Sequence, residues 1–461
     1  MKTKYLLLTA SAALALGACT KQAAVEQTPA APAEIAVGFD AYTSRGVDTK
    51  AGVAGELTTA RLQDNTTPDP MNAAGFGVFG FYTDNNDYDS NCVPNFMYNQ
   101  KVTYVGSAWT YTPVKYWPNE YGASAISDDR DKVSFFAYAP YVGVIPSSGK
   151  YDGDVADTKW GITGLSRNTM NGDPLVKYLV SFDPAESVDL VWGVVPDAAT
   201  TWNIINGGSQ TMVAGMPWTD VQRPEDAQKL KFTFKHATSK LNVMIDADPD
   251  ITAHATTPAV AAETKVYVRS ITFTGFATKG ALNLNNQAAN TAYWMDYAGV
   301  DDLMTGEEVT IFDGRKDGKE GAADALASNE KVLGLNPVII SDNGNTTPGV
   351  TRAFVNLFDD AQKTTPVYVI PTGDPVKVTI VYDVETADDN LAVYLSDGKT
   401  LGSSVQNTIS KDITFGGSSK LENGKAYTLK LHLGLNSVKF EAEVTDWSNG
   451  GGQNGWLPAN N

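Results

Sequence analysis

The sequence predicts an all-β protein of two tandem β-sandwich domains with mostly antiparallel strands. Apolar residues recur at every second position in many short runs, which is the period of a strand with one buried face. Clusters of Gly, Asn, Asp and Pro separate these runs, as expected for turns. Helical periodicity is scarce, and only the Ala-rich stretch 321–331 predicts a short helix. A chain of 461 residues has room for two such domains.

The first 18 residues are typical of an export signal. Lys2 and Lys4 precede a short apolar run, which ends at Leu16-Gly17-Ala18-Cys19. Because this run is too short to cross a bilayer permanently, we expect it to be cleaved. Small residues ahead of a cysteine resemble the lipobox of bacterial lipoproteins, which implies attachment of lipid (palmitate) at Cys19. A secretory signal with an incidental cysteine is the alternative.

A tether and a strand follow the signal. Residues 19–34 are rich in Ala, Pro, Glu and Thr, so we expect them to stay solvated and disordered. The next apolar residues alternate and predict a strand with one apolar face: Ile35, Val37, Phe39 and Ala41.

A polar stretch follows this strand, and it contains the basic residue Arg45 and then Gly46. We expect a trypsin-like protease to cut after Arg45, because exposed polar loops are the preferred sites of proteolysis. Lys50 and Arg61 are competing cut sites. A solvated arginine in an ordinary loop is the plain alternative.

Further runs predict strands at 76–82, 132–141, 230–234, 241–245, 265–273, 366–370, 376–384, 426–433 and 438–444. The charged, proline-containing stretch 216–228 is the best boundary, which divides the chain into domains at 35–222 and 223–447. Residues 448–461 form a Gly/Asn-rich tail, and the Asn/Thr/Ala-rich segments 285–300 and 325–350 are expected to be surface insertions.

Composition disfavours several classes of partner. Acidic residues outnumber basic ones by 53 to 35, for a net charge of −18, which repels nucleic acid and anionic membrane surfaces. Membrane attachment is therefore expected to come from the lipid. The chain has two cysteines, so acylation of Cys19 leaves Cys92 alone and without a disulfide. We expect Cys92 to be structural.

No catalytic, metal or cofactor motif stands out. Ser147 and Lys150 match S-x-x-K but lack the companion motifs of the enzymes that use it. The three histidines lack the spacing of metal ligands. The loop 84–91 is rich in Asp and Asn, which leaves calcium binding open, although an acidic surface loop is the default.

Several stretches, taken in order after the lipobox and the strand 35–42 with Arg45, resemble the fimbrillin-like (Mfa-like) pilins of Bacteroidetes, the subunits of type V pili. They are 77–82 (GVFGFY), 96–100 (FMYNQ), 109–111 (WTY), 115–118 (KYWP), 133–141 (VSFFAYAPY), 232–241 (FTFKHATSKL), 424–427 (GKAY) and 438–447 (VKFEAEVTDW). The resemblance implies export as an outer-membrane lipoprotein, proteolytic release of the first strand, and assembly with other pilus subunits in an extracellular fimbrium. It also implies a role in adhesion, with a receptor on a host or bacterial surface.

Removal of the first strand leaves a groove that a strand of another subunit can fill. Each large side chain buried there contributes about 1.5–3 kcal/mol. The candidate donor strand presents Val438, Phe440, Ala442 and Val444, since the glycine-rich tail makes a poor strand. Alternatively the subunit donates nothing and lies at a tip or an anchor of the pilus. A second function class also stays open, a surface glycan-binding lipoprotein whose many aromatic residues stack on sugars.

Overall fold

The computed structural model describes residues 34–43, 56–64, 75–89, 91–121, 130–145, 151–154, 161–184, 186–198, 200–247, 264–302, 307–313, 339–341, 355–356, 367–371, 375–395, 399–415, 420–433 and 438–446. Nearly all regular structure in these ranges is β-strand, so the predicted all-β sandwich fold is confirmed. In the same ranges no helix is long and apolar enough to cross a membrane.

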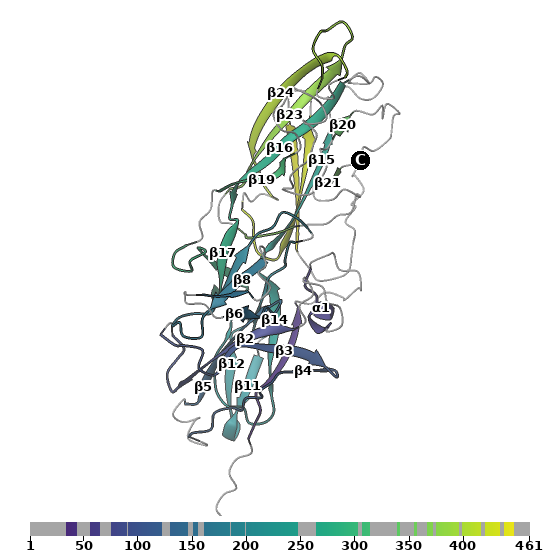
Figure 1. Cartoon of the computed structure of the whole chain (residues 1–461). Coiled ribbons are helices and arrows are strands. Elements are labelled where there is room, and N and C mark those ends of the chain that lie inside the picture. Colours follow the sequence, from purple (N-terminus) through teal and green to yellow (C-terminus); the bar gives the residue numbers. More distant parts are fainter. Residues whose placement is uncertain are drawn as a thin grey trace, which may run out of the picture. The chain divides into compact units, whose positions relative to one another are not determined.

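An eight-stranded sheet contains the first strand, in the order β1-β14-β10-β5-β2-β3-β4 with β13 beside β5 (Figure 1). Its strands are β1 (Gly38–Thr43), β2 (Phe76–Asp84), β3 (Met97–Val105), β4 (Ala108–Thr110), β5 (Lys132–Ala139), β10 (Val191–Val194), β13 (Trp218–Val221) and β14 (Lys229–His236).

A six-stranded sheet and a hairpin come from the same part of the chain. The sheet has the order β18-β17-β9-β8-β7-β6, and β11 and β12 form a two-stranded hairpin. The strands are β6 (Val144–Ile145), β7 (Tyr151–Asp154), β8 (Gly161–Ser166), β9 (Leu175–Leu179), β11 (Thr200–Ile204), β12 (Gly208–Met212), β17 (Lys279–Ala288) and β18 (Thr291–Met295), with a short 3₁₀ turn η1 (Ile205–Gly207).

Two five-stranded sheets hold the remaining strands, in the orders β21-β15-β25-β26 with β22 beside β15, and β19-β16-β23-β24 with β20 beside β16. These strands are β15 (Ser239–Ala247), β16 (Thr264–Phe276), β19 (Glu307–Asp313), β20 (Ile339–Ser341), β21 (Val355–Asn356), β22 (Val367–Val369), β23 (Lys377–Ala387), β24 (Gly402–Asp412), β25 (Lys425–Leu433) and β26 (Val438–Asp446).

Every strand expected from the sequence has a counterpart in these sheets. Two expectations were wrong or incomplete. The segment 285–300 is not a surface insertion throughout, because it contains the end of β17 and all of β18, and the helix α1 (Thr59–Gln63) was not foreseen. The expected helix at 321–331 and most of the segment 325–350 lie outside the described residues.

Strand pairing crosses the expected domain boundary. The strand β14 lies beyond residue 222 but pairs with β1 and β10, and β17 pairs with β9. The division at 222/223 therefore stays a prediction that the pairing does not support. Two strand pairs are parallel, β1 with β14 and β15 with β25, whereas the other named pairs in the described residues are antiparallel.

The eight-stranded sheet is buried on both faces at its centre, as the fully buried strand β5 shows. On one face Val133, Phe135 and Ala137 join a cluster that we call the β1 core, because Val37, Phe39 and Ala41 belong to it. On the other face Phe136 and Tyr138 join a larger cluster that reaches residues of the six-stranded and both five-stranded sheets. Alternation along β5 thus divides its side chains between two cores.

A buried carboxylate links β10 and β14 to the segment before α1 by hydrogen bonds. Asp189, which precedes β10, accepts a hydrogen bond from the Leu57 backbone nitrogen at 2.8 Å, and its Oδ2 lies 2.9 Å from Nδ1 of His236. The hydroxyl of Thr238 donates to the same carboxylate at 3.5 Å. Asp189 and His236 are 0% and 2% exposed, so the contact gives each of them a polar partner inside the protein.

Replacing Asp189 should therefore be costly. We expect Asp189→Ala to lower the free energy of unfolding by about 3–5 kcal/mol, because it leaves buried donors without an acceptor. Asp197→Ala is the matched control, since Asp197 is 58% exposed where it pairs with Lys235, and we expect about 0–1 kcal/mol there. Urea unfolding followed by tryptophan fluorescence measures both, and equal effects would contradict the role given to Asp189.

Candidate functional site

The segment 35–43, which contains β1, is hydrogen-bonded to β14 on one side and to residues 115–117 on the other. From Gly38 to Thr43 it runs parallel to β14, in the register Gly38↔Lys229 to Thr43↔Phe234. Just before β1 the chain pairs on its other side with the segment after β4. There the Val37 nitrogen donates to the Lys115 carbonyl at 2.8 Å, and the Trp117 nitrogen donates to the Ile35 carbonyl at 2.9 Å. Removing β1 leaves both neighbouring segments with unpaired backbone groups.

The apolar face expected for β1 points into the β1 core. Val37, Phe39 and Ala41 are 2%, 1% and 3% exposed, and Ile35 packs against the same core while partly buried. The ring of Phe39 lies among the rings of Phe76, Tyr111, Phe135 and Phe232, with centroid separations of 6.3, 5.4, 6.1 and 6.0 Å. These distances are those of favourable aromatic pairs.

Tyr111 links the residue before β1 to the segment after β4. Its hydroxyl donates to the Val37 carbonyl at 2.8 Å and accepts from the Lys115 nitrogen at 3.2 Å. Burial raises the pKa of Tyr111 above its ordinary value, so the phenol stays protonated and remains a donor to β1.

The end of β1 is bonded to α1. The Thr43 nitrogen donates to Oγ1 of Thr59 at 3.0 Å, and the two threonine hydroxyls lie 3.0 Å apart. Leu57 and Leu62, which flank Thr59, are 1% and 0% exposed. The predicted cut at Arg45 would fall between β1 and this buried segment, so the segment would stay in the processed chain.

The predicted processing residues Arg45 and Gly46, the competing site Lys50 and the predicted lipid site Cys19 lie outside the described residues. Arg61 is described and lies within α1, where its backbone nitrogen donates to Oγ1 of Thr58. A residue in a short helix fixed by buried Leu62 is a poorer protease substrate than one in a loop. The structure therefore disfavours Arg61 as a cut site.

The candidate donor strand β26 forms an edge of its own sheet. It pairs antiparallel with β25 from Leu433↔Val438 to Lys425↔Asp446, and no other described strand pairs with it. Ala442 and Val444 are partly buried against the larger core. The structure does not describe the side chains of Val438 and Phe440. An edge strand loses only one ladder when it leaves a sheet.

The two strands share a sequence pattern that the analysis of separate runs missed. Residues 37–43 read VGFDAYT and residues 438–444 read VKFEAEV. Val, Phe and Ala recur at the same spacing, with an acidic residue between the Phe and the Ala. A direct comparison of the two strands would have revealed it.

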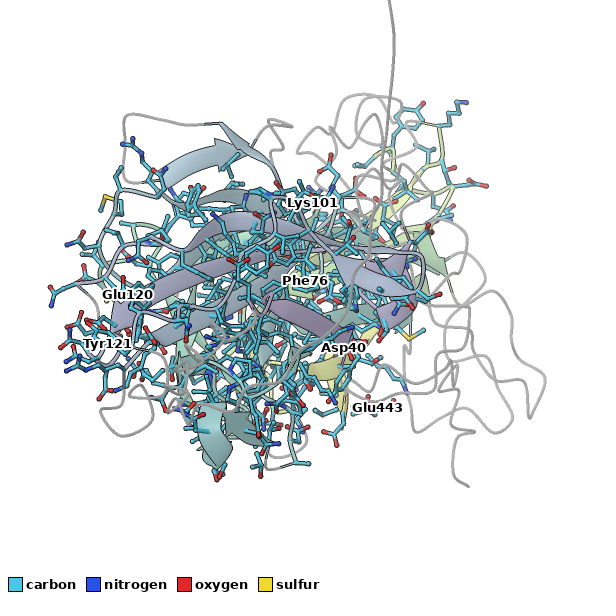
Figure 2. The ribbon with its side chains drawn as sticks, turned by 90° about the horizontal axis from the view of Figure 1, so that it is seen from below. Asp40, Phe76, Lys101, Glu120, Tyr121 and Glu443 are labelled. Carbon is cyan, nitrogen blue, oxygen red and sulfur yellow. The ribbon has the colours of Figure 1, made fainter. Side chains whose placement is uncertain are left out.

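Other candidate sites do not assemble. In the calcium-like loop, Asp87 pairs with Lys132 at 2.7 Å and Asp89 accepts from the Asn91 nitrogen at 2.8 Å. The structure instead gathers Asp84 with Glu120 and Asp131, whose ligand atoms lie within 4.8 Å of one another. Figure 2 shows Glu120 beside Tyr121, which donates to Asp84 at 3.4 Å. Burial raises the pKa of Asp131.

The remaining reactive or aromatic side chains have structural surroundings. Cys92 is half-buried, burial raises the pKa of its thiol, and its Sγ lies 3.6 Å from Asp89. The tryptophans in the described part of the chain are buried, so their rings are not available there for stacking on sugars. They are Trp109, Trp117, Trp192, Trp202, Trp218 and Trp294.

Comparisons with known proteins show which family this chain is similar to. The family model described as fimbrillin-like matches residues 211–447. The curated fimbrium subunit Fim1C of Phocaeicola vulgatus is 35% identical over 144 residues, which are 31% of this chain and 31% of that protein, so the match spans less than a third of the relative. The crystal structure of a fimbrial protein from Bacteroides vulgatus shares the fold with a TM-score of 0.50 at 20% identity, over 90% of this chain and 99% of that one. Because the family match covers more than half of the sequence, this chain belongs to the fimbrillin-like family.

Proposed function

We propose that the chain is a structural subunit of an adhesive fimbrium, exported as a lipoprotein and activated when a protease removes β1. The observation that supports this most directly is the position of β1. It is buried on one face and paired with β14, and residues 35–37 just before it pair with residues 115–117 on the other side. A basic residue follows it before the chain is fixed again at Leu57. A strand with these properties is a removable plug.

In this scheme Cys19 carries the lipid that holds the precursor at the outer membrane, and residues 19–34 are the tether. A trypsin-like protease cuts after Arg45, and departure of β1 frees the subunit from the lipid. The same step exposes the β1 core, including the rings that surrounded Phe39. The open groove then takes up a strand from another pilus subunit, which restores both backbone ladders.

Intact β1 keeps the precursor monomeric. Burial of Val37 and Phe39 contributes roughly 1.5–3 kcal/mol for each side chain, and the hydrogen bonds from Thr43 to Thr59 and from Tyr111 to Val37 add to it. Because β1 belongs to the same chain, it also competes at a high effective concentration against any incoming strand. Proteolysis removes that advantage without altering the groove.

Proteolysis of the lipid-free precursor tests the plug. Trypsin should produce a chain that begins at Gly46 and forms ladders resistant to sodium dodecyl sulfate, as shown by N-terminal sequencing and by electrophoresis without boiling. Arg45→Ala should abolish both products, whereas Lys50→Ala, the matched control, should leave them unchanged. A surface-sheared protein that begins only at Cys19 would contradict processing at this site.

Weakening the plug should open the groove without a protease. We expect Phe39→Ala to destabilise the precursor by about 3–5 kcal/mol, as for other buried Phe→Ala changes, and to promote oligomers of the uncut chain. Tyr42→Ala, on the opposite face of the same strand, should change stability by less than half as much. Urea unfolding and light scattering measure the two variants, and similar behaviour of both would argue against a plug that depends on its apolar face.

A further inference from the structure

We infer that two copies of this chain associate side by side through the edge strand β24. Residues 403–411 of one copy pair antiparallel with the same residues of the other, about a two-fold axis at Asn407. The contact uses neither β1 nor its groove and does not depend on cutting at Arg45. It therefore goes beyond the proposed function and can be tested separately from it.

The outer edge of β24 is a long ladder with no described strand beside it. β24 is the last strand of its five-stranded sheet, and it pairs with β23 over 11 residues without a bulge (Figure 1). Proteins usually protect such an edge with charged residues, proline or bulges, because its backbone groups can pair with another chain. Between Gly402 and Ser410, β24 contains no charged residue and no proline.

Charge distinguishes β24 from the other long edges. The strand β19, at the opposite margin of the same sheet, has three acidic residues among its 7, and β26 has four charged residues among its 9. A chain with a net charge of −18 repels its own copies. The charges of Lys411 and Asp412 at the end of β24 cancel, so this edge adds no net charge to that repulsion.

The direction of the backbone groups shows which residues can accept a second strand. The Asp388 nitrogen donates to the Leu401 carbonyl at 2.8 Å, which extends the ladder between β23 and β24. The Gly402 nitrogen points the other way and donates to the Val393 carbonyl at 2.9 Å. Because neighbouring residues alternate in direction, the backbone groups of every second residue point away from β23. These residues are Ser404, Gln406, Thr408 and Ser410.

The loop before β24 limits the open edge and adds apolar surface to it. Val393 occupies the edge at Gly402, so an incoming strand can pair from residue 403 to residue 411. The side chains of Val393 and its neighbour Tyr394 are 67% and 61% exposed. Exposed apolar side chains beside a strand edge are typical of a surface that binds another protein chain.

The open stretch is complementary to itself. Asn407 lies at its centre, so full antiparallel overlap with a second copy places Val405 opposite Ile409, twice by symmetry. Val405 is 59% exposed, whereas Ile409 is partly buried against the larger core. Apolar cross-strand pairs stabilise a sheet. The pairing therefore covers Val405 and continues the apolar face of the sheet into the second copy.

Other registers lose this match. A shift of two residues in either direction places Val405 opposite Asn407 or Lys411 instead of Ile409. A shift of one residue brings outward backbone groups opposite inward ones, which prevents a regular ladder. In the inferred register Lys411 lies opposite Ser403, so no like charges meet.

A single contact of this kind is weak. The open edge is about 30 Å long and, at a sheet thickness of ~10 Å, covers roughly 300 Å² of each copy, less than the ~800 Å² of a stable interface. An isolated precursor is therefore monomeric at low concentration. In a fimbrium, a step that rests on the proposed function, many such contacts act together and would join neighbouring filaments side by side.

Disulfide trapping in the lipid-free, uncut chain tests the pairing and its register. In the Cys92→Ser background, Asn407→Cys places two thiols opposite each other at a Cα separation of ~4.5 Å, within the range of a disulfide. Mild oxidation should therefore link Asn407→Cys into dimers at least tenfold faster than Ser403→Cys, the matched control that faces Lys411. Electrophoresis without reductant measures both, and urea unfolding shows that each variant is folded. Equal rates would overturn the pairing, and a faster reaction of Gln406→Cys or Thr408→Cys would overturn the register.

Charged variants of two exposed residues provide a second test. Gln406 of one copy lies opposite Thr408 of the other in this register, and both side chains are exposed. The double variant with Gln406→Lys and Thr408→Lys should weaken self-association by about 2- to 10-fold, and so should the double variant with Glu at both positions. A mixture of the two should associate at least as tightly as the wild type, as measured by sedimentation at high concentration.

No recovery in the mixture would overturn the inference. Both experiments use the uncut chain, so their outcome is independent of the proposed function. Failure of the chain cut at Arg45 to polymerise would contradict that function and leave the β24 contact unaffected.

Discussion

The packing of Phe39 among four aromatic rings is the contact on which the first sheet and the proposed assembly both depend. The rings come from β2, β5, β14 and the segment after β4, so one side chain joins elements that are far apart in the sequence. Without the strand that carries Phe39, water would contact these rings, and it cannot replace the lost aromatic packing. In the proposed assembly, the same packing that completes the precursor would make the opened subunit associate strongly.

The connection after β1 separates what leaves from what remains. Thr43 is bonded to Thr59, but Leu57 and Leu62 are buried independently and Leu57 is bonded to Asp189. Glu56 also pairs with Lys240 of β15 at 3.2 Å. The retained segment is thus fixed to the rest of the chain by contacts that a cut at Arg45 does not touch. Release of β1 can then open a groove without loosening the neighbouring sheets.

In the proposed assembly, one groove holds β1 in the precursor and a strand of another subunit after processing. The incoming strand needs no greater complementarity than the resident one, because the resident strand is favoured mainly by its covalent attachment. The hydroxyl pair of Thr43 and Thr59 favours the resident strand further. Activation then requires a single broken peptide bond, and no rearrangement of the aromatic cluster.

Alternation in the sequence was enough to identify some of the strands, β5, β14 and β26 among them, and the buried face of β1, since a period of two specifies which side chains share a face. It also contained the common Val, Phe and Ala spacing of β1 and β26. Only the tertiary structure decided that β1 runs parallel to β14, that β14 belongs to the first sheet, and that Asp84 meets Glu120 and Asp131. The physical reason is that a local pattern tells which face of a strand is buried but not which strand pairs with it. Such pairing depends on contacts between distant parts of the chain, here the ring of Phe39 against those of Phe135 and Phe232.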